Sequence, residues 1–211
     1  DYTKLRAEQA ARRASGSVKQ LGIGVSVYVE ITAGSSAGEA AKIEVTQDGR
    51  AIVYTGTSPH GQGHVTAWSM IASDQTGIPL DKIDVVWGDT DLVPKGGGTM
   101  GSRSLQQGGV AVHVAAGELV EQARKHAARL LEANEEDVVF DKESASFHVA
   151  GTPAVAKSWA DLSIALAKDG GLVQETDYVA QGATFPFGAH VSVVEVDTET
   201  GQVKMLRHVA C

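Results

Sequence analysis

Hydrophobic residues alternate with small or polar ones in several parts of the chain, or form short apolar runs, as is typical of β-strands. The clearest stretch is 23–31, where Ile or Val occupies every second position. Gln47-Asp48-Gly49 separates two such stretches and predicts a hairpin over 42–54. Residues 34–38 are small and predict a loop. The predicted strands are 23–31, 43–45, 52–54, 83–87, 138–140, 145–149, 172–180, 190–196 and 203–209.

A second pattern, with apolar residues every three to four positions, predicts amphipathic helices. Over 64–76 it places Trp68, Ile71 and Ala72 on one face, and Gly77 is a typical helix end. The predicted helices are 3–14, 64–76, 104–132 and 158–170.

The order of these elements indicates the fold class. Ser158-Trp159-Ala160-Asp161 resembles a capping box and marks the start of the last helix. Strands and helices intermingle with hairpins and do not follow a regular β-α-β alternation. The chain is therefore predicted to be α+β, with mixed or antiparallel sheets packed against two or three helices.

Composition and charge exclude several classes of protein. The chain carries 26 acidic and 18 basic residues, a formal net charge of −8, and only 5% aromatic residues, so a nucleic-acid partner is not expected. No apolar run approaches the roughly 20 residues that span a bilayer, and no signal peptide begins the chain. Cys211 is the single cysteine, which excludes an internal disulfide framework. We expect a cytoplasmic protein.

Both ends of the sequence are unusual for a whole protein. Asp1-Tyr2 is not a usual start, and the last residues lie within a strand-like run. We therefore interpret the sequence as an internal piece of a longer polypeptide. Within it, 1–18 is assigned as an N-terminal flank and 19–211 as one partial domain.

Two glycine-rich polar loops each lead into a predicted helix, at 64–76 and at 104–132. The first is Gly61-Gln62-Gly63-His64, and the second covers 96–104. Exposed amides at a helix start bind anions, so two such loops can clamp a ligand that carries several phosphate or other acceptor oxygens. A flexible strand-to-helix turn and a mobile surface loop are the simpler alternatives for these segments.

The second loop does not fit either common nucleotide motif. Residues 96–101 match G-x-G-x-x-G literally, but Glu118 and Glu121 lie within the predicted helix and not at the tip of a second strand. A Walker loop is excluded because Ser102-Arg103 follows Gly101. What this loop offers is a set of amides and hydroxyls, with Arg103 as a charged fork.

Other polar groups indicate no metal or catalytic site. His60 and His64 are four residues apart, but the glycines between them argue against a shared helical metal site. Asp89 and Asp91 lack a third nearby carboxylate, and no Gly-x-Ser-x-Gly elbow is present. No catalytic and no metal-ligating residue is therefore assigned within this chain.

Five motifs, taken in order, carry a resemblance to a known family. They lie at 61–64, 77–79, 88–91, 99–104 and 184–189. From about residue 20 to the end, the chain resembles the large subunits of molybdenum hydroxylases, the xanthine dehydrogenase and aldehyde oxidase family. The Gly-Ser-Arg-Ser of the second loop is most similar to the carbon monoxide dehydrogenase large-chain branch. On this resemblance the chain is an internal fragment of the molybdopterin-binding region.

The resemblance implies a cofactor and the residues that contact it. The cofactor would be molybdopterin, in its cytosine dinucleotide form, with molybdenum bound in the parent enzyme. The first loop would contact pterin or diphosphate, and the second the pterin and the surroundings of the metal. The residues assigned in this way are Gly61, Gln62, Gly63, His64, Thr99, Gly101, Ser102, Arg103 and Ser104.

The same resemblance implies what the parent protein does. It would oxidise an aldehyde, a heterocycle or carbon monoxide with water as oxygen source, and pass electrons to iron–sulfur and FAD-binding subunits or domains. The family's catalytic glutamate, in a Gly-x-Gly-Glu loop, is expected beyond residue 211, and Met100 stands where the most similar branch has an aromatic residue. The chain alone is expected to be inactive and free of cofactor. A non-catalytic binding or assembly module of the same fold is the alternative.

Overall fold

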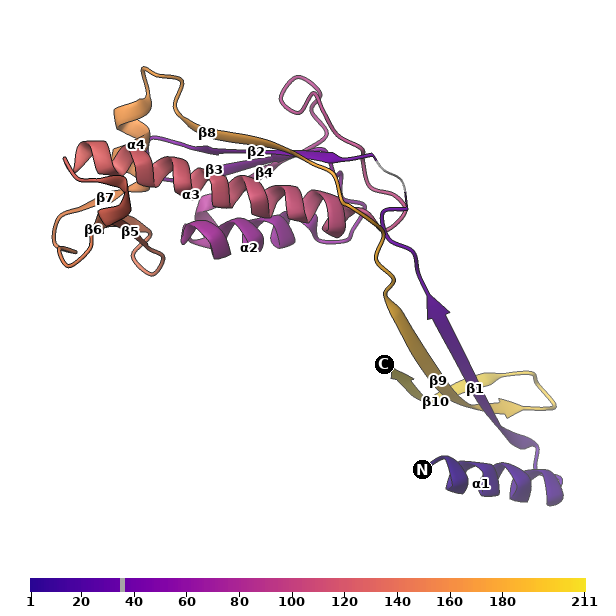
Figure 1. Cartoon of the computed structure of the whole chain (residues 1–211). Coiled ribbons are helices and arrows are strands. Elements are labelled where there is room, and N and C mark those ends of the chain that lie inside the picture. Colours follow the sequence, from indigo (N-terminus) through magenta and orange to yellow (C-terminus); the bar gives the residue numbers. More distant parts are fainter. Residues whose placement is uncertain (35–36) are drawn as a thin grey trace. The chain divides into compact units, whose positions relative to one another are not determined.

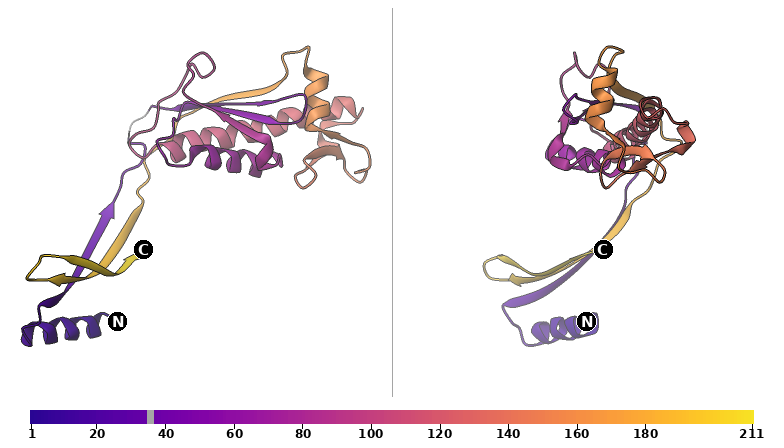
Figure 2. Two further views of the ribbon diagram at one scale, coloured as in Figure 1. Left: turned by 180° about the vertical axis from the view of Figure 1, so that it is seen from behind. Right: turned by 90° about the vertical axis from the view of Figure 1, so that its left-hand side faces the viewer.

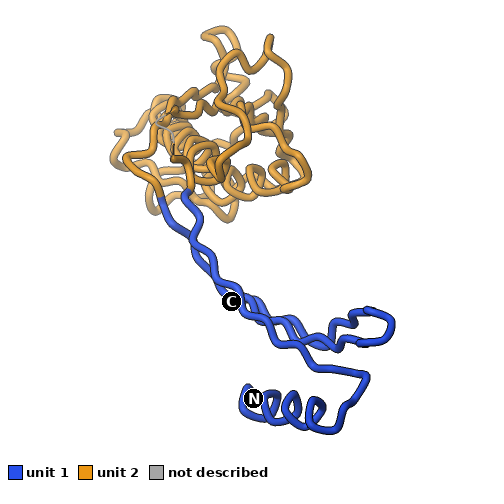
Figure 3. The backbone as a smooth tube through the Cα atoms, turned by 90° about the vertical axis from the view of Figure 1, so that its right-hand side faces the viewer, with its two compact units in different colours: residues 1–31, 184–211 blue, residues 32–183 orange. Residues whose placement is uncertain are grey.

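The computed structural model describes residues 1–34 and 37–211, and these form two compact units (Figure 3). One unit combines 1–31 with 184–211, and the other comprises 32–183. The sequence-based boundary after residue 18 does not coincide with this division, because the helix before it belongs to the same unit as the strand after it. The predicted loop at 34–38 includes residues 35–36, which lie outside the described residues.

The unit made from both chain ends is an antiparallel sheet accompanied by one helix (Figure 1). Its elements are α1 (Tyr2–Ala14), β1 (Lys19–Val29), β9 (Phe187–Asp197) and β10 (Val203–Ala210). The strand order is β1-β9-β10. Asp1 caps α1 by accepting a hydrogen bond from the Thr3 amide at 2.9 Å. The Gln9 side chain joins the helix to β1 by donating to the Leu21 carbonyl at 2.8 Å.

The second unit is built on a four-stranded mixed sheet of order β4-β3-β2-β8. Its strands are β2 (Glu39–Val45), β3 (Ala51–Thr55), β4 (Ile83–Val86) and β8 (Leu172–Tyr178). β3 and β4 are parallel, whereas the other neighbouring strands are antiparallel. Buried residues alternate along β2 and β3, so the sheet has one covered face. The helices α2 (His64–Thr76) and α3 (Val110–Leu130) cover that face (Figures 1 and 2).

Smaller elements complete the second unit. They are β5 (Val138–Asp141), β6 (Ser146–Val149), β7 (Ala156–Ser158), α4 (Trp159–Leu166), and the short helices η1 (Leu80–Lys82), η2 (Ser104–Gly109) and η3 (Glu135–Asp137). β5, β6 and β7 form an antiparallel sheet. At the start of α4, Ser158 and Asp161 form the predicted capping box. None of the helices within 1–34 and 37–211 is long and apolar enough to cross a membrane.

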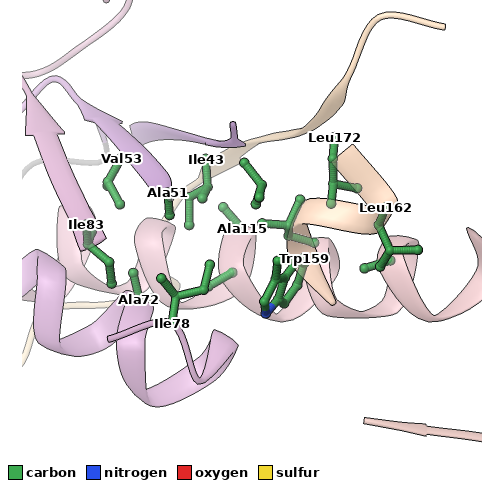
Figure 4. Close-up of a cluster of buried hydrophobic side chains, with 14 of the residues drawn as sticks. Ile43, Ala51, Val53, Ala72, Ile78, Ile83, Ala115, Trp159, Leu162 and Leu172 are labelled. Carbon is green, nitrogen blue, oxygen red and sulfur yellow. The ribbon is translucent and has the colours of Figure 1, made fainter. Parts of the chain in front are cut away.

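The hydrophobic core of the second unit lies between its sheet and its helices (Figure 4). Ile43 and Val53 from the sheet and Leu162 from α4 are fully buried there. On its buried face, α3 carries mainly small residues, which allow it to pack closely on the sheet. These are Ala111, Val112, Ala115, Ala116, Leu119, Ala123, Ala127 and Ala128.

The α+β prediction is confirmed, and the helix at 64–76 has the predicted bounds. Gly77 ends that helix in the left-handed conformation, with φ of 67°. The helix predicted over 104–132 differs from the observed one, because 104–109 form a turn of π-helix and only Val110–Leu130 is α-helical. Its glycines pack against side chains, and a β-carbon at Gly108 would lie 2.6 Å from the Thr57 side chain and one at Gly109 2.9 Å from the Trp68 ring. The spacing of apolar residues along the sequence gives no information about this tertiary packing, so the π-helical turn was not predicted.

Candidate functional site

The first glycine-rich loop turns directly into α2. Gly61 and Gly63 have φ of 105° and 77°, a backbone region that favours glycine, and Gly63 is the residue before the first helical turn. Gly63, at the N-cap position, has no side chain to cap the helix. Its first-turn amides are therefore available to an acceptor group. The Gln62 side-chain oxygen accepts a hydrogen bond from the His60 amide at 2.5 Å, which holds the carboxamide in place.

His64, the first residue of α2, is held by a polar network beneath the loop. Its ring is buried and packs on Trp68 with 5.1 Å between ring centroids. Its Nδ1 lies 3.4 Å from the Thr57 carbonyl oxygen, and the Trp68 indole donates to the Thr57 hydroxyl at 3.1 Å. A carbonyl oxygen only accepts, so this contact needs the proton on Nδ1, and Nε2 of the neutral ring keeps its lone pair.

The second loop adds hydroxyl groups next to the first. Thr99 and Ser104 lie 3.1 Å apart, hydroxyl to hydroxyl, at the start of η2. Ser102 has a φ of 52°, which is uncommon for a residue with a β-carbon. Strain of this kind is often found at binding loops.

The two loops line one hollow of about 560 Å³. Its lining residues are Gln62, His64, Ala67, Trp68, Thr99, Met100, Gly101, Ser102, Ser104 and Leu105. Six of the nine residues assigned from the sequence are thus brought together, and Gly61, Gly63 and Arg103 are not among the lining residues. Volume alone does not single out this hollow, because others of about 580 and 610 Å³ lie along and near the end of α3. What distinguishes it is the uncapped start of α2 and the absence of any carboxylate from its lining.

Arg103 lies beneath the second loop and holds it to β2. Its guanidinium pairs with the Glu39 carboxylate at 2.5 Å, and the two side chains are only 3% and 0% exposed. It also donates to the carbonyl oxygens of Gly98 and Gly38, at 2.8 and 2.6 Å. Glu39 in turn accepts from the Gly97 amide at 3.0 Å. Arg103 thus fixes the shape of the loop from below, whereas the sequence assigned it to the ligand side.

Gly96 of the same loop is required by backbone packing. A β-carbon at Gly96 would lie 2.4 Å from the Cα of Gly56, at the end of β3. Gly96 and Gly97 are therefore explained by packing on Gly56 and on the Arg103 guanidinium, and Gly98 by its φ of 74°, without a ligand.

Glu39 is a site-supporting residue that the sequence analysis missed, although the sequence contains a signal for it. It is in phase with Ala41, Ile43 and Val45, the buried positions of β2. A carboxylate on the buried side of a strand needs a cationic or hydrogen-bonding partner, and this pattern could have indicated the pair with Arg103.

The histidines of the first loop do not form a metal site. His60 is exposed, and His64 is buried against Trp68. In the part of the chain that the structure describes, no three His, Cys, Asp or Glu side chains lie close enough to hold a metal ion.

Comparison with known proteins decides what kind of domain this is. The family model described as the molybdopterin cofactor-binding domain matches residues 1–211. The chain belongs to this family. The resemblance to molybdenum hydroxylase large subunits is therefore confirmed.

Individual members of this cofactor-binding family agree with that assignment. The carbon monoxide dehydrogenase large chain of Hydrogenophaga pseudoflava is 36% identical over 227 residues, which cover 100% of this chain and 28% of that protein. A subunit of the 6-hydroxypseudooxynicotine dehydrogenase complex of Paenarthrobacter nicotinovorans is 32% identical, over 98% of this chain and 26% of that protein. The chain thus spans a little over a quarter of the length of these relatives.

Solved structures of this family have the same fold. A Cu,Mo-containing carbon monoxide dehydrogenase superposes with a TM-score of 0.87 at 34% identity, over 99% of this chain and 29% of that one. Quinoline 2-oxidoreductase from Pseudomonas putida 86 gives a TM-score of 0.80 at 28% identity, over 99% of this chain and 28% of that one.

The hollow between the two loops has the chemistry that a molybdopterin needs. Trp68, Ala67 and Leu105 form an apolar part suited to a flat ring system. Hydroxyls and the amides at the start of α2 can donate to phosphate oxygens. The nearby Glu39 carboxylate is neutralised by Arg103 and does not face the hollow as a free charge. The residues present therefore fit the cofactor that the family binds.

Proposed function

We propose that this chain is the cofactor-binding segment of the large, catalytic subunit of a molybdenum-dependent oxidoreductase. The observation that carries the proposal is the convergence of the two glycine-rich loops on one carboxylate-free hollow. The family membership supports it independently. When bound, the molybdenum cofactor would supply the redox chemistry, and the chain would supply binding and orientation.

The residues of the hollow would divide the binding between them. The carboxamide of Gln62, held by the His60 amide, would present its NH2 group to the cofactor. The amides at the start of α2 and the hydroxyls of Thr99 and Ser104 would donate to its oxygens. His64 would offer Nε2 as an acceptor, which suits an N–H group of the pterin better than a phosphate. Gly61 and Gly63 would let the backbone approach closely.

We further propose the cytosine dinucleotide form of the cofactor and iron–sulfur and FAD-binding partners for the parent enzyme. The two relatives described above are named for carbon monoxide and for a nicotine-derived substrate, so the substrate class stays broad: an aldehyde, a heterocycle or carbon monoxide. The catalytic glutamate would be supplied outside residues 1–211. The cytoplasmic location and the inactivity of the isolated chain stay predictions.

The test is metal analysis of the full-length parent subunit, produced with its maturation machinery. We expect about one molybdenum per subunit in the unaltered protein. Filling the hollow with Ser104→Trp should lower the molybdenum content at least about tenfold. His113→Trp, at an exposed position on α3, is the matched control and should leave the content unchanged.

Two outcomes would contradict the proposal. Full molybdenum content in the folded Ser104→Trp subunit would place the cofactor elsewhere. No molybdenum in a matured, unaltered subunit would favour the non-catalytic module of the same fold.

A further inference from the structure

The sheet formed by the two chain ends carries a pair of histidines that the cofactor site does not use. His190 lies on β9 and His208 on the neighbouring β10 (Figure 1). Their rings are stacked with 5.4 Å between centroids and 27° between planes. Nδ1 of His190 lies 3.3 Å from Nε2 of His208. Two ring nitrogens thus face each other on a solvent-accessible part of the sheet.

Each ring is held by a partner of its own. Ser192 lies directly opposite His208 in the strand pairing, and its hydroxyl is 2.9 Å from Nδ1 of that ring. Tyr28 of β1 stacks on His190 with 5.9 Å between centroids. Tyr28 can reach this position because its strand partner is Gly188, where a β-carbon would lie 2.7 Å from the tyrosine ring. The two imidazoles are therefore oriented before anything binds.

The separation of the two nitrogens matches that of two ligands on one zinc ion. Zn–N bonds of 2.0–2.1 Å at a tetrahedral angle put the two nitrogens about 3.3 to 3.4 Å apart. At the right angle that square-planar Cu²⁺ prefers, bonds of about 2.0 Å would bring them to about 2.8 Å. The observed 3.3 Å is the separation that tetrahedral Zn²⁺ needs, and it is also that of the direct hydrogen bond between the two rings when no metal is bound.

We propose that His190 and His208 form a two-histidine Zn²⁺ site on the sheet of the chain-end unit. Nδ1 of His190 and Nε2 of His208 are the ligands, and Ser192 accepts a hydrogen bond from the protonated Nδ1 of His208. A histidine that binds a metal through one ring nitrogen usually donates the N–H of the other to an outer hydrogen-bond partner, and here Ser192 is that partner. The described residues supply no third ligand, so water or an added ligand completes the tetrahedron. The proposal is independent of the molybdenum cofactor.

The first experiment measures zinc affinity by competition with a chromophoric chelator, using the 211-residue chain. Cys211 has an exposed thiol, and thiolates are zinc ligands, so every protein in this experiment carries Cys211→Ser. We expect one zinc per chain, and at least about tenfold weaker binding in His190→Gln and in His208→Gln. Ser192→Ala should weaken binding about tenfold. His113→Gln removes an exposed histidine from α3 and should change nothing.

The second experiment needs no substitution at the site. Zinc is titrated into the Cys211→Ser chain while the imidazole nitrogens of all seven histidines are followed by NMR. The proposal expects large ¹⁵N shifts at Nδ1 of His190 and Nε2 of His208, and at no other histidine. Zinc affinity that is unchanged in folded His190→Gln or His208→Gln, or shifts that begin at other histidines, would overturn it.

Discussion

At the scale of single residues, the Arg103–Glu39 pair is the most consequential contact of the site. Both side chains are buried, so replacing Arg103 by Met leaves an uncompensated carboxylate in the protein interior. We expect Arg103→Met to lower the free energy of unfolding by about 3 to 5 kcal/mol. Lys95→Met breaks the exposed pair with Asp177 and should cost less than about 1 kcal/mol. Urea unfolding measures the free energy of unfolding of both variants. Equal losses of stability in the two variants would contradict the structural role of Arg103.

Arg103 also shows which features of single residues could be predicted from the sequence and which could not. The sequence indicated that polar groups gather at two loops, and the structure brings Gln62, His64 and Ser104 to one hollow. It did not indicate that Arg103 turns inward, because a motif gives no side-chain direction. That direction depends on Glu39, which is 64 positions away in the sequence and adjacent only in the folded chain.

A second residue-scale prediction concerns Asp197, the last residue of β9. Mainly because Lys19 donates a hydrogen bond to its carboxylate, the pKa of Asp197 falls from 3.8 to about 2. The folded-state pKa is depressed, so the stabilisation is fully present above pH 3.8 and is lost as the pH falls from 3.8 to 2. Asp197→Asn should therefore unfold at lower urea concentration than the unaltered chain at pH 6, and at a similar concentration at pH 2. A difference that persists unchanged at pH 2 would contradict the depressed pKa.

At the scale of elements, the local pattern of apolar and turn residues was sufficient to predict most helices and strands. The bounds of α2, the hairpin of β2 and β3 and the capping box of α4 all follow from side-chain period or turn chemistry within a few residues. The π-helical start of the long helix could not be predicted in this way. In this turn Gly108 packs on the Thr57 side chain and Gly109 on the Trp68 ring. Both partners belong to a distant part of the sequence.

The ends of α2 allow an element-scale prediction with a control of opposite sign. Gly63 and Gly77 both have left-handed φ, so alanine at either position should destabilise the chain by about 1 to 2 kcal/mol. Gly77→Ala should lower the free energy of unfolding more than Gly63→Ala does. A β-carbon at Gly77 would lie 2.3 Å from the Lys142 carbonyl oxygen, whereas one at Gly63 would have no neighbour within 4 Å.

Gly117, inside α3, is the control for these substitutions. Its nearest neighbour would be 3.9 Å from an added β-carbon, so Gly117→Ala should stabilise the chain by about 0.5 to 1 kcal/mol. Thermal unfolding of the three variants ranks their stabilities. A Gly63→Ala protein as stable as Gly117→Ala would contradict the assigned helix start.

At the scale of the whole molecule, the division into two units could not be predicted from the sequence. β1 pairs with β9 in a register that joins Lys19 to Asp197. Nothing in a local hydrophobic pattern selects a partner strand so far along the chain. The flank assigned at 1–18 separated the first helix from the rest of the chain, whereas α1 is tied to β1 by the hydrogen bond from Gln9 to the Leu21 carbonyl.

The two units differ in how much apolar surface they bury, which predicts unequal stability. The core of the second unit combines buried residues from its sheet and helices, whereas Leu21 and Val193 are the buried apolar residues described in the chain-end unit. In that unit Val25, Val27 and Phe187 are 67%, 76% and 80% exposed. Little burial means a small free energy of local opening.

Hydrogen exchange of the 211-residue chain tests this difference. Amides of β1, β9 and β10 should exchange at least about tenfold faster than those of β2 and β3, although both sets are hydrogen-bonded in sheets. Val193→Ala should accelerate exchange in the first set only, and Val53→Ala in the second set, because each removes buried surface from one unit. Equal protection in all five strands, or a common response to both variants, would mean that the two units open as one cooperative structure.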